Sequence, residues 1–408
     1  MIEYGLLGET LGHSFSPYLH RAFADYEYCL LPTPREELAM LLQRREFRGL
    51  NVTMPYKQAV MPLCDEIDER AAQIGAVNTI VNRNGRLVGY NTDIDGLLFM
   101  ARRAGITLKN KKVLILGSGG TSRTARAAAQ ECGAAEIVVI SRSGEDNYEN
   151  LDRHQDAQVI INTTPVGMFP RCGESPVDLA RFPKLAGVLD VVYNPLRTAL
   201  FLQAEELGIP CACGLSMLTA QAARAAELFA NVAIGDERIE EVFLRLHRQR
   251  ENIVLIGMPG CGKSTIAAAL AGKTGREPVD VDEKIEERAG KSIPAIFAED
   301  GEAYFRALET ECIREAGARS GIVISTGGGC VVREENYAPL RQNGFLIHLV
   351  RDLSRLPRDG RPISQRTEAS ALWEQRKERY ARFADAVVDN NGTPEATLAQ
   401  IEQELMKR

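Results

Sequence analysis

The stretch VLILGSGGTSRTARAAA, residues 113–129, is an apolar run followed by a glycine-rich turn and an alanine-rich segment. A second stretch, IVLIGMPGCGKSTIAAALA at residues 253–271, has the same design. Each predicts a buried strand that turns tightly into a helix, whose N-terminus can hold phosphate. The first turn has the pattern GxGxx[GS], which suits a dinucleotide pyrophosphate, whereas the second has GxxxxGK[ST], which cradles a nucleoside triphosphate with Mg²⁺. The sequence therefore indicates two different nucleotide sites.

The length and composition indicate a globular protein with more than one domain. With 408 residues and about 150 residues per domain, two or three domains are expected. The 45% hydrophobic and 25% charged fractions are typical of folded domains. A net charge of −6 provides no broad basic surface for nucleic acid or for an anionic membrane. We therefore expect small-molecule partners, and composition alone indicates no oligomeric state.

The N-terminus and the cysteines favour the cytoplasm. The start MIEYGLLGETLGHSF has an acidic third residue and lacks the cationic and apolar regions of a signal peptide. No apolar run approaches the roughly 18 residues of a membrane span. Nine cysteines are scattered without CxxC pairs, and their odd number favours reduced thiols.

Alternating apolar and helix-like segments predict an α/β protein with four regions. Residues 1–103 form a first α/β layer, and residues 104–235 repeat strand and helix in the manner of buried parallel strands. A helix at about 213–234 is expected to pack back on the first layer. Residues 236–251 form a charged helical connector with an apolar stripe, which we expect to pack mainly on the regions before it. Residues 252–408 form a second α/β domain with a parallel sheet.

The first glycine turn is expected to bind NADP(H). Gly117, Ser118, Gly119 and Gly120 would let the backbone approach a pyrophosphate closely. About twenty residues later, at the end of the next strand, NAD sites usually place Asp or Glu. This chain instead has Ser141, Arg142 and Ser143, whose cation and hydroxyls suit the 2′-phosphate of NADP.

The second glycine turn is expected to bind ATP and Mg²⁺. Its backbone N–H groups would form the phosphate nest, Lys263 would reach the β- and γ-phosphate oxygens, and Ser264 would ligate Mg²⁺. The residues expected around the nucleotide are Gly257, Gly260, Cys261, Gly262, Lys263, Ser264 and Thr265.

Several motifs around the first turn closely resemble shikimate dehydrogenase. They cover roughly residues 1–235 and are, in order, GHSFSPYLH (12–20), NVTMPYK (51–57), GAVNT (75–79), GYNTDIDG (89–96), NTTPVGM (162–168), DVVYNP (190–195) and GLSMLTAQA (214–222). That family interconverts 3-dehydroshikimate and shikimate with NADP(H). The resemblance implies that Lys57 and Asp93 are the catalytic pair. It also implies substrate contacts from Ser14, Ser16, Asn51, Thr53, Asn78, Tyr193 and Gln221.

The implied catalytic pair is chemically reasonable for this reaction. Reduction of a ketone by hydride requires a proton for the developing alkoxide, and a lysine beside a carboxylate can deliver it. Neutral donors can read ring hydroxyls without burying a further charge. The chain departs from the family after NTD, where a glycine is usual and this sequence has Ile94 and then Asp95.

The motifs after the second turn resemble shikimate kinase. They are PVDVDEKIE (278–286), SIPAIFAEDGEAYFRALE (292–309), ISTGGGCVV (324–332) and GRPIS (360–364). The resemblance implies that Asp280 assists Mg²⁺ through water and that Asp282 is the base at the acceptor hydroxyl. It implies that Arg306 and Arg376 clamp the substrate carboxylate and that Arg361 closes over the phosphates from a lid. Gly327, Gly328 and Gly329 would let the backbone approach the substrate ring.

The combined interpretation is a two-lobed dehydrogenase with a Rossmann-type NADP domain, followed by a P-loop kinase. Such an enzyme would reduce 3-dehydroshikimate to shikimate and then phosphorylate its 3-hydroxyl. Three alternatives stay open at this point. The dehydrogenase could use quinate, the kinase could use another hydroxylated acceptor such as gluconate or a nucleotide, or one module could be a non-catalytic nucleotide sensor.

Overall fold

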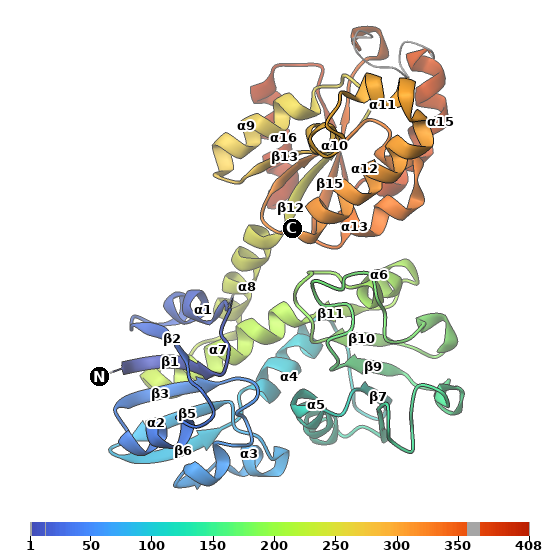
Figure 1. Cartoon of the computed structure of the whole chain (residues 1–408). Coiled ribbons are helices and arrows are strands. Elements are labelled where there is room, and N and C mark those ends of the chain that lie inside the picture. Colours follow the sequence, from blue (N-terminus) through green and yellow to red (C-terminus); the bar gives the residue numbers. More distant parts are fainter. Residues whose placement is uncertain (1, 13, 357–367, 408) are drawn as a thin grey trace. The chain divides into compact units, whose positions relative to one another are not determined.

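The structure, a computed structural model, describes residues 2–12, 14–356 and 368–407. The chain divides into two compact units, whose elements are labelled in Figure 1. Unit 1 consists of Met1–Met168, Glu174–Tyr193 and Leu200–Leu246, and unit 2 consists of Phe169–Gly173, Asn194–Ala199 and His247–Arg408. The predicted α/β class is confirmed in both units.

The first lobe of unit 1 contains a six-stranded mixed sheet with the order β2-β1-β3-β5-β6-β4. The neighbours β3 and β5, and β5 and β6, run antiparallel, and the other pairs are parallel. Asn84 and Gly85 join β5 to β6 with φ angles of 53° and 86°, as a two-residue hairpin turn requires. The elements are β1 (Ile2–Gly8), α1 (Ser16–Phe23), β2 (Tyr28–Pro32), α2 (Leu38–Arg44), β3 (Phe47–Val52), η1 (Met61–Leu63), β4 (Glu66–Ile67), α3 (Glu69–Ile74), β5 (Thr79–Arg83), β6 (Arg86–Tyr90) and α4 (Asp93–Arg103).

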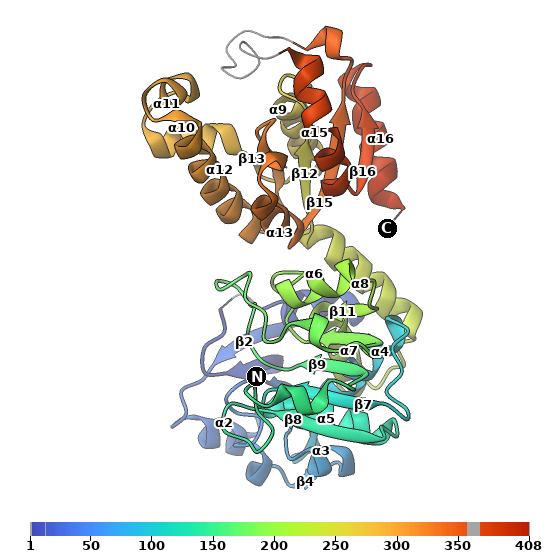
Figure 2. The same cartoon turned by 90° about the vertical axis from the view of Figure 1, so that its right-hand side faces the viewer.

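The second lobe of unit 1 contains a five-stranded parallel sheet with the order β11-β10-β9-β7-β8, several strands of which face the viewer in Figure 2. Its strands are almost continuously apolar, as expected for a parallel sheet that helices cover on both faces. The elements are β7 (Lys112–Leu116), α5 (Gly120–Glu131), β8 (Glu136–Ile140), η2 (Leu151–His154), β9 (Val159–Asn162), η3 (Leu179–Arg181), β10 (Gly187–Asp190), α6 (Ala199–Glu206), β11 (Cys211–Cys213) and α7 (Gly214–Ala230).

Helices α4 and α7 pack against each other and connect the two lobes of unit 1. Ala225 and Phe229 of α7 are buried together with Tyr4 and Tyr28 of the first sheet. The two helices approach closely at Gly96, where an added Cβ atom would lie 2.5 Å from the carbonyl oxygen of Met217. A side chain at position 96 would therefore separate the helices that join the lobes.

The connector is a single helix, α8 (Asp236–Arg250). Its apolar stripe, formed by Ile239, Val242, Phe243 and Leu246, is buried. Ile239 lies in one cluster with Phe99 of α4 and with Ala220 and Ala223 of α7. Arg103 of α4 forms an ion pair with Glu240 at 2.8 Å and lies over the ring of Phe243. The residues of α8 up to Leu246 thus belong to unit 1.

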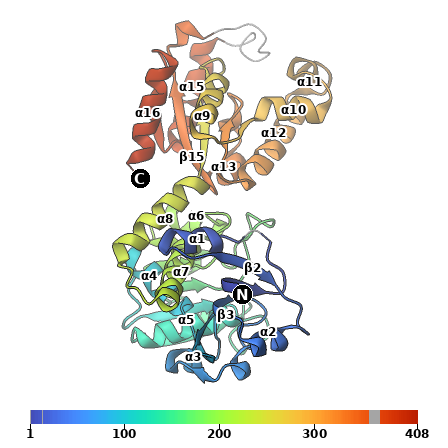
Figure 3. The ribbon, with the colours of Figure 1, turned by 90° about the vertical axis from the view of Figure 1, so that its left-hand side faces the viewer.

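Unit 2 is built on a five-stranded parallel sheet with the order β13-β14-β12-β15-β16. Figures 2 and 3 show α16 on one side of this sheet and α12 and α13 on the other. Its buried apolar side chains form one continuous cluster. The elements are β12 (Asn252–Ile256), α9 (Lys263–Thr274), β13 (Pro278–Asp280), α10 (Val281–Ala289), α11 (Ile293–Glu299), α12 (Gly301–Ala318), β14 (Val323–Ser325), η4 (Cys330–Val332), η5 (Glu334–Asn336), α13 (Tyr337–Arg341), β15 (Gly344–Val350), η6 (Leu353–Arg355), α15 (Ala369–Phe383), β16 (Ala386–Asp389) and α16 (Pro394–Met406).

The close approach at Gly96 predicts an unusual response to Gly96→Ala. Alanine in a helix normally stabilises relative to glycine by about 1 kcal/mol, but here the added methyl group meets backbone and should cost a net of about 1–3 kcal/mol. Gly272→Ala in α9 is the matched control, because no atom lies within 4 Å of the position that its Cβ would take. Calorimetry of the full chain should show the unfolding transition of unit 1 lowered by Gly96→Ala, while Gly272→Ala lowers neither transition. Equal effects of the two substitutions would contradict the close packing of α4 on α7.

Candidate active sites

Lys57 and Asp93, the acid–base pair expected from the sequence, form an ion pair in unit 1. Nζ of Lys57 lies 2.6 Å from Oδ2 of Asp93, and the two side chains are 21% and 12% exposed. Lys57 lies in the turn after β3, and Asp93 is the first residue of α4, where its backbone N–H donates to Oδ1 of Asn91 at 3.1 Å. A lysine held beside a carboxylate in a partly shielded site keeps its proton available for an acceptor in front of the pair.

Buried hydrogen bonds connect the first sheet to the residue before Asp93. The hydroxyl of Tyr28 donates to Oδ1 of Asn51 at 2.8 Å, and Nδ2 of Asn51 donates to Oγ1 of Thr79 at 3.0 Å. The Thr79 hydroxyl donates to Oδ1 of Asn78 at 3.0 Å, which also accepts the N–H of Thr92 at 2.7 Å. All five residues are buried, so each bond holds a polar group that would be costly to leave unpaired.

Gln221 joins this network from α7. Nδ2 of Asn78 donates to Oγ1 of Thr92 at 3.0 Å and to Oε1 of Gln221 at 3.5 Å. The structure thus brings together three of the expected substrate residues, Asn51, Asn78 and Gln221. Thr79 and Thr92 link them, and Tyr28 donates to Asn51 at one end of the network. The sequence analysis did not identify these three residues. The two threonines directly follow asparagines in GAVNT and YNTD. This repeated Asn-Thr pair is the sequence feature that could have indicated them.

The other expected substrate residues of unit 1 lie in two places. Ser14 and Ser16 lie at the N-terminus of α1 with their hydroxyl oxygens 3.2 Å apart. The ring of Tyr193 contacts that of Phe15 edge-on, at 5.9 Å between centroids, so Tyr193 lies beside the two serines. Thr53 follows β3, where its N–H donates to the carbonyl oxygen of Leu7 at 2.9 Å. These hydroxyls are of the kind that binds a carboxylate or a ring hydroxyl.

The departure at Asp95 does not disturb the Lys57–Asp93 ion pair. Oδ1 of Asp95 lies 2.9 Å from Nη1 of Arg70 on α3, and Nη2 of Arg70 lies 3.1 Å from Oε2 of Glu131 on α5. The additional carboxylate is thereby directed to a neighbouring helix. Helix α4 begins at Asp93 in spite of the change.

The first glycine turn fits a dinucleotide pyrophosphate. Gly117 has a φ of 104°, which favours glycine, and a Cβ there would lie 3.0 Å from Oγ1 of Thr163. Gly119 and Gly120, at the start of α5, have no atom within 4 Å of the positions that Cβ atoms would take. No described side chain or distant backbone therefore crowds these two glycines, which suits an anion site at a helix N-terminus. Ser141, Arg142 and Ser143 follow β8, and the latter two are exposed.

The second glycine turn surrounds a buried lysine. Gly257, Gly260 and Gly262 have φ angles of 148°, 80° and 99°, so the turn depends on residues without side chains. Nζ of Lys263 donates to the carbonyl oxygens of Gly257 at 2.9 Å and of Met258 at 3.1 Å. The turn thus holds the ammonium group at the place where the phosphates of a nucleotide would bind.

The residues behind this turn fit Mg²⁺. Oγ of Ser264 donates to Oδ2 of Asp280 at 2.7 Å and lies 3.3 Å from Oγ of Ser325. The structure places no group of three or more His, Cys, Asp or Glu side chains suited to a metal ion within the residues it describes. A nucleotide-bound Mg²⁺ needs only one or two protein oxygens, because phosphates and water supply the rest.

Asp282 is a half-buried carboxyl group suited to act as a base. Burial raises its pKa from 3.8 to about 6, and the neighbouring Asp280 adds to the effect. A Cβ atom added at Gly327 would lie 2.7 Å from Oδ1 of Asp282 and 2.8 Å from Oε1 of Glu309. That oxygen of Glu309 is buried and has no hydrogen-bond partner among the residues that the structure describes. Two carboxyl groups therefore face one glycine, and the sequence analysis identified only Asp282.

Two buried arginines lie beside the glycine run at 327–329. Nη1 of Arg306 pairs with Oε2 of Glu309 at 2.7 Å, and a Cβ at Gly329 would lie 2.3 Å from Nη1 of Arg306. Nη1 of Arg376 donates to the carbonyl oxygen of Gly328 at 2.9 Å. The predicted arginines and glycines thus form one site. Glu309 follows Arg306 by three residues on the buried face of α12, a spacing that could have indicated it.

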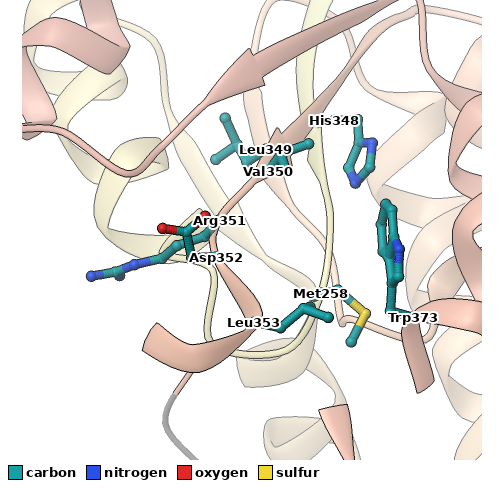
Figure 4. Close-up of a pocket in the computed structure, with 8 residues that line it drawn as sticks. All are labelled: Met258, His348, Leu349, Val350, Arg351, Asp352, Leu353 and Trp373. Carbon is teal, nitrogen blue, oxygen red and sulfur yellow. The ribbon is translucent and has the colours of Figure 1, made fainter. Parts of the chain in front are cut away.

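A cavity of about 210 Å³ lies beside the second glycine turn (Figure 4). It is lined by Met258 of that turn, by His348 to Leu353 and by Trp373 of α15. His348 stacks on Tyr380 at 4.6 Å between centroids, and burial lowers its pKa to about 4. The ring is therefore uncharged at neutral pH. Arg361, expected to close over the phosphates, lies outside the described residues.

The comparisons with known proteins agree with the geometry of unit 1. The family model described as shikimate dehydrogenase substrate binding domain matches residues 6–80. The shikimate dehydrogenase (NADP(+)) of Clostridium perfringens strain 13 is 33% identical over 264 residues, which are 60% of this chain and 97% of the relative. The chain belongs to the shikimate dehydrogenase family. The family model described as shikimate kinase matches residues 259–406, so the chain also carries a shikimate kinase domain.

Further relatives show the same coverage. A shikimate dehydrogenase (NADP(+)) of Bacillus cereus strain 03BB102 is 34% identical over 271 residues, 59% of this chain and 97% of the relative. The crystal structure of a chorismate mutase/shikimate 5-dehydrogenase fusion protein from Clostridium acetobutylicum is 36% identical, with a TM-score of 0.58, and covers 60% of this chain and 97% of its own. The shikimate 5-dehydrogenase from Thermus thermophilus, solved with NADP(H) and shikimate, is 33% identical with a TM-score of 0.55 and covers 60% of this chain and 99% of its own.

The Tyr28 hydroxyl is predicted to support the network of the dehydrogenase site. Tyr28→Phe leaves Oδ1 of buried Asn51 without its donor and should destabilise unit 1 by about 1–3 kcal/mol. Tyr90→Phe, which removes a more exposed hydroxyl of the same sheet, should change the stability by less than about 0.5 kcal/mol. Thermal unfolding of the full chain compares the two, and an unchanged transition for Tyr28→Phe would exclude a structural role of this hydrogen bond.

Proposed function

We propose that the protein is a bifunctional shikimate-pathway enzyme. Unit 1 reduces 3-dehydroshikimate to shikimate with NADPH, and unit 2 phosphorylates shikimate to shikimate 3-phosphate with ATP and Mg²⁺. One observation carries the proposal: each unit combines a glycine-lined phosphate cradle with a partly or fully buried acid–base group. These groups are the Lys57–Asp93 pair and Asp282.

In unit 1, bound NADPH supplies a hydride to the carbonyl carbon of the substrate. Lys57, oriented by Asp93, delivers a proton to the oxygen of that carbonyl as negative charge develops there. Ser14 and Ser16 bind the substrate carboxylate, with Tyr193 beside them. Neutral groups hold the ring hydroxyls, namely Asn51, Thr53, Asn78 and Gln221.

In unit 2, ATP with Mg²⁺ supplies the phosphoryl group. Lys263 and Ser264 hold the nucleotide phosphates and the metal, with Asp280 behind them. Asp282 accepts the proton of the attacking hydroxyl, while Arg306 and Arg376 bind the carboxylate of the acceptor. Arg361 is proposed to cover the phosphates. Glu309 balances the charge of Arg306 and keeps its guanidinium in place.

We also propose a cellular compartment for the enzyme and a boundary between its two halves. Seven cysteines, namely Cys29, Cys64, Cys132, Cys172, Cys261, Cys312 and Cys330, are free thiols, which is usual for a reducing compartment, and we propose the cytoplasm. No described helix combines the length and apolarity that crossing a membrane would require. We further propose that the dehydrogenase ends with α8 and that the kinase begins at β12.

An assay of the full chain with every substrate and nucleotide tests the proposed function. We expect oxidation of NADPH only with 3-dehydroshikimate and release of ADP only with shikimate. Faster turnover of quinate would assign the first unit to a different substrate, and ADP release with gluconate would do so for the second. A unit that binds its nucleotide without turnover of any substrate would be a sensor rather than an enzyme.

Lys57 is predicted to be essential for the reduction of 3-dehydroshikimate but not for the phosphorylation of shikimate. Lys57→Ala should lower turnover of 3-dehydroshikimate roughly 10²- to 10⁴-fold, the scale of a lost acid–base group. Phosphorylation of shikimate by the same preparation is the internal control and should not change. Near wild-type reduction by this variant would show that another group protonates the alkoxide.

The raised pKa of Asp282 predicts a pH dependence of the kinase. A base must be ionised, and the carboxyl group takes up its proton as the pH falls through about 6. The kcat/KM for shikimate phosphorylation should therefore fall about tenfold for each pH unit below that value. Asp282→Asn should be slower by roughly 10²-fold or more and should lack this acidic limb. A variant that keeps the limb would place the titration elsewhere.

A further inference from the structure

The loop at residues 141–150 lies next to the first glycine turn. The N–H of Gly117 donates to the carbonyl oxygen of Ile140 at 2.8 Å, directly before this loop. The loop carries Arg142 and Ser143, whose side chains are exposed. An exposed arginine loses much conformational entropy when it binds a ligand. Selective binding through Arg142 therefore depends on how firmly the rest of the loop holds its backbone.

Several hydrogen bonds close this loop on itself. The N–H of Ser141 donates to the carbonyl oxygen of Asp146 at 3.2 Å. Gly144 lies between these two residues in the chain. A Cβ atom at position 144 would lie 2.6 Å from Oγ of Ser141, so the glycine leaves room for that hydroxyl. Nδ2 of Asn147 donates to the carbonyl oxygen of Gly144 at 3.3 Å. The chain is thus folded back immediately behind Arg142.

Asn150 reinforces the far end of the loop. Its Nδ2 donates to the carbonyl oxygen of Glu145 at 2.8 Å, and its Oδ1 accepts the N–H of Asn147 at 2.9 Å. One amide side chain therefore satisfies both a carbonyl and an N–H that a surface loop would otherwise leave to water.

His154 fastens the closed loop to the protein core. Its Nε2 lies 2.9 Å from Oδ1 of Asp146, and its side chain is only 10% exposed. Because a carboxylate only accepts, Nε2 is the nitrogen that carries the proton in this contact. His154 ends η2, whose first residue, Leu151, is buried in the apolar cluster below the sheet. The contact thus joins a surface loop to a fixed element.

We propose that the pair of His154 and Asp146 holds the 141–150 loop in the conformation that binds the 2′-phosphate of NADP. His154 is then a positioning residue that sets the preference for NADP over NAD without touching the cofactor. The proposal rests on the proposed NADP-dependent dehydrogenase function and on Arg142 as the residue that contacts the phosphate.

Calorimetric binding to the full chain tests this role without catalysis. The probes are adenosine 2′,5′-bisphosphate, which has the 2′-phosphate, and 5′-AMP, which lacks it. His154→Ala should weaken binding of the bisphosphate roughly five- to twentyfold, the scale of one charge-assisted hydrogen bond, and leave binding of 5′-AMP unchanged. His154→Gln, which can donate to Asp146 again, should restore most of the affinity.

Two further variants separate the possible explanations. Asp152→Asn changes the same element, η2, but Asp152 pairs with Arg181 at the surface, so it should affect neither probe. Arg142→Ala should abolish the difference between the probes. If Arg142→Ala is selective and His154→Ala is not, the anchor proposal is wrong while the NADP site stands. If the unchanged protein binds both probes equally, the proposed NADP preference fails, and the anchor proposal fails with it.

A variant that changes only the loop distinguishes an effect of loop conformation from general unfolding of the protein. Asn150→Ala removes two hydrogen bonds of the loop and leaves His154 and the apolar cluster intact. It should reproduce the selective loss of the bisphosphate with little change in the melting temperature. An equal loss for both probes, from Asn150→Ala or from His154→Ala, would show general disruption and would overturn the proposal.

Discussion

Both units depend on the same constraint, which is the sharp turn from a buried parallel strand into a helix. The first N–H groups of such a helix have no partner within it, and the turn must leave them exposed to a ligand. Gly117 in unit 1 and Gly257 and Gly262 in unit 2 adopt the positive φ angles that make this possible. In unit 2 the ends of β13 and β14 bring Asp280 and Ser325 to the same edge, so the position of the turn determines where the chemistry can occur.

The two sites balance charge in different ways. The dehydrogenase site has one ion pair, Lys57–Asp93, and a network of neutral amides and hydroxyls. The candidate site of unit 2 buries three cations, Lys263, Arg306 and Arg376. Arg306 pairs with the buried carboxylate of Glu309, and the other two donate to backbone carbonyl oxygens. A buried charge is tolerated only with a partner. The second site is therefore preorganised for anions, whereas the first is suited to reading hydroxyl groups on an uncharged part of a ring.

The parts of the protein that could be predicted from the sequence are those determined by neighbouring residues. The two glycine turns, the strand and helix that flank each, and the apolar stripe of α8 all follow from local patterns. The role of Tyr28 and the contact between Glu309 and Asp282 could not be predicted in this way. Tyr28 donates to a residue 23 positions away, and Glu309 meets Asp282 only across Gly327. The mixed order of the first sheet likewise depends on contacts between distant segments.

Nucleotide binding to unit 2 has to be an exchange, because Lys263 already has partners. Its ammonium group donates to the carbonyl oxygens of Gly257 and Met258. An arriving phosphate competes with these two carbonyl oxygens for the hydrogens of the ammonium group. The free energy of binding is then the difference between two sets of hydrogen bonds, which is far smaller than either set alone. The lysine in the empty site is therefore never left as an unpaired buried charge.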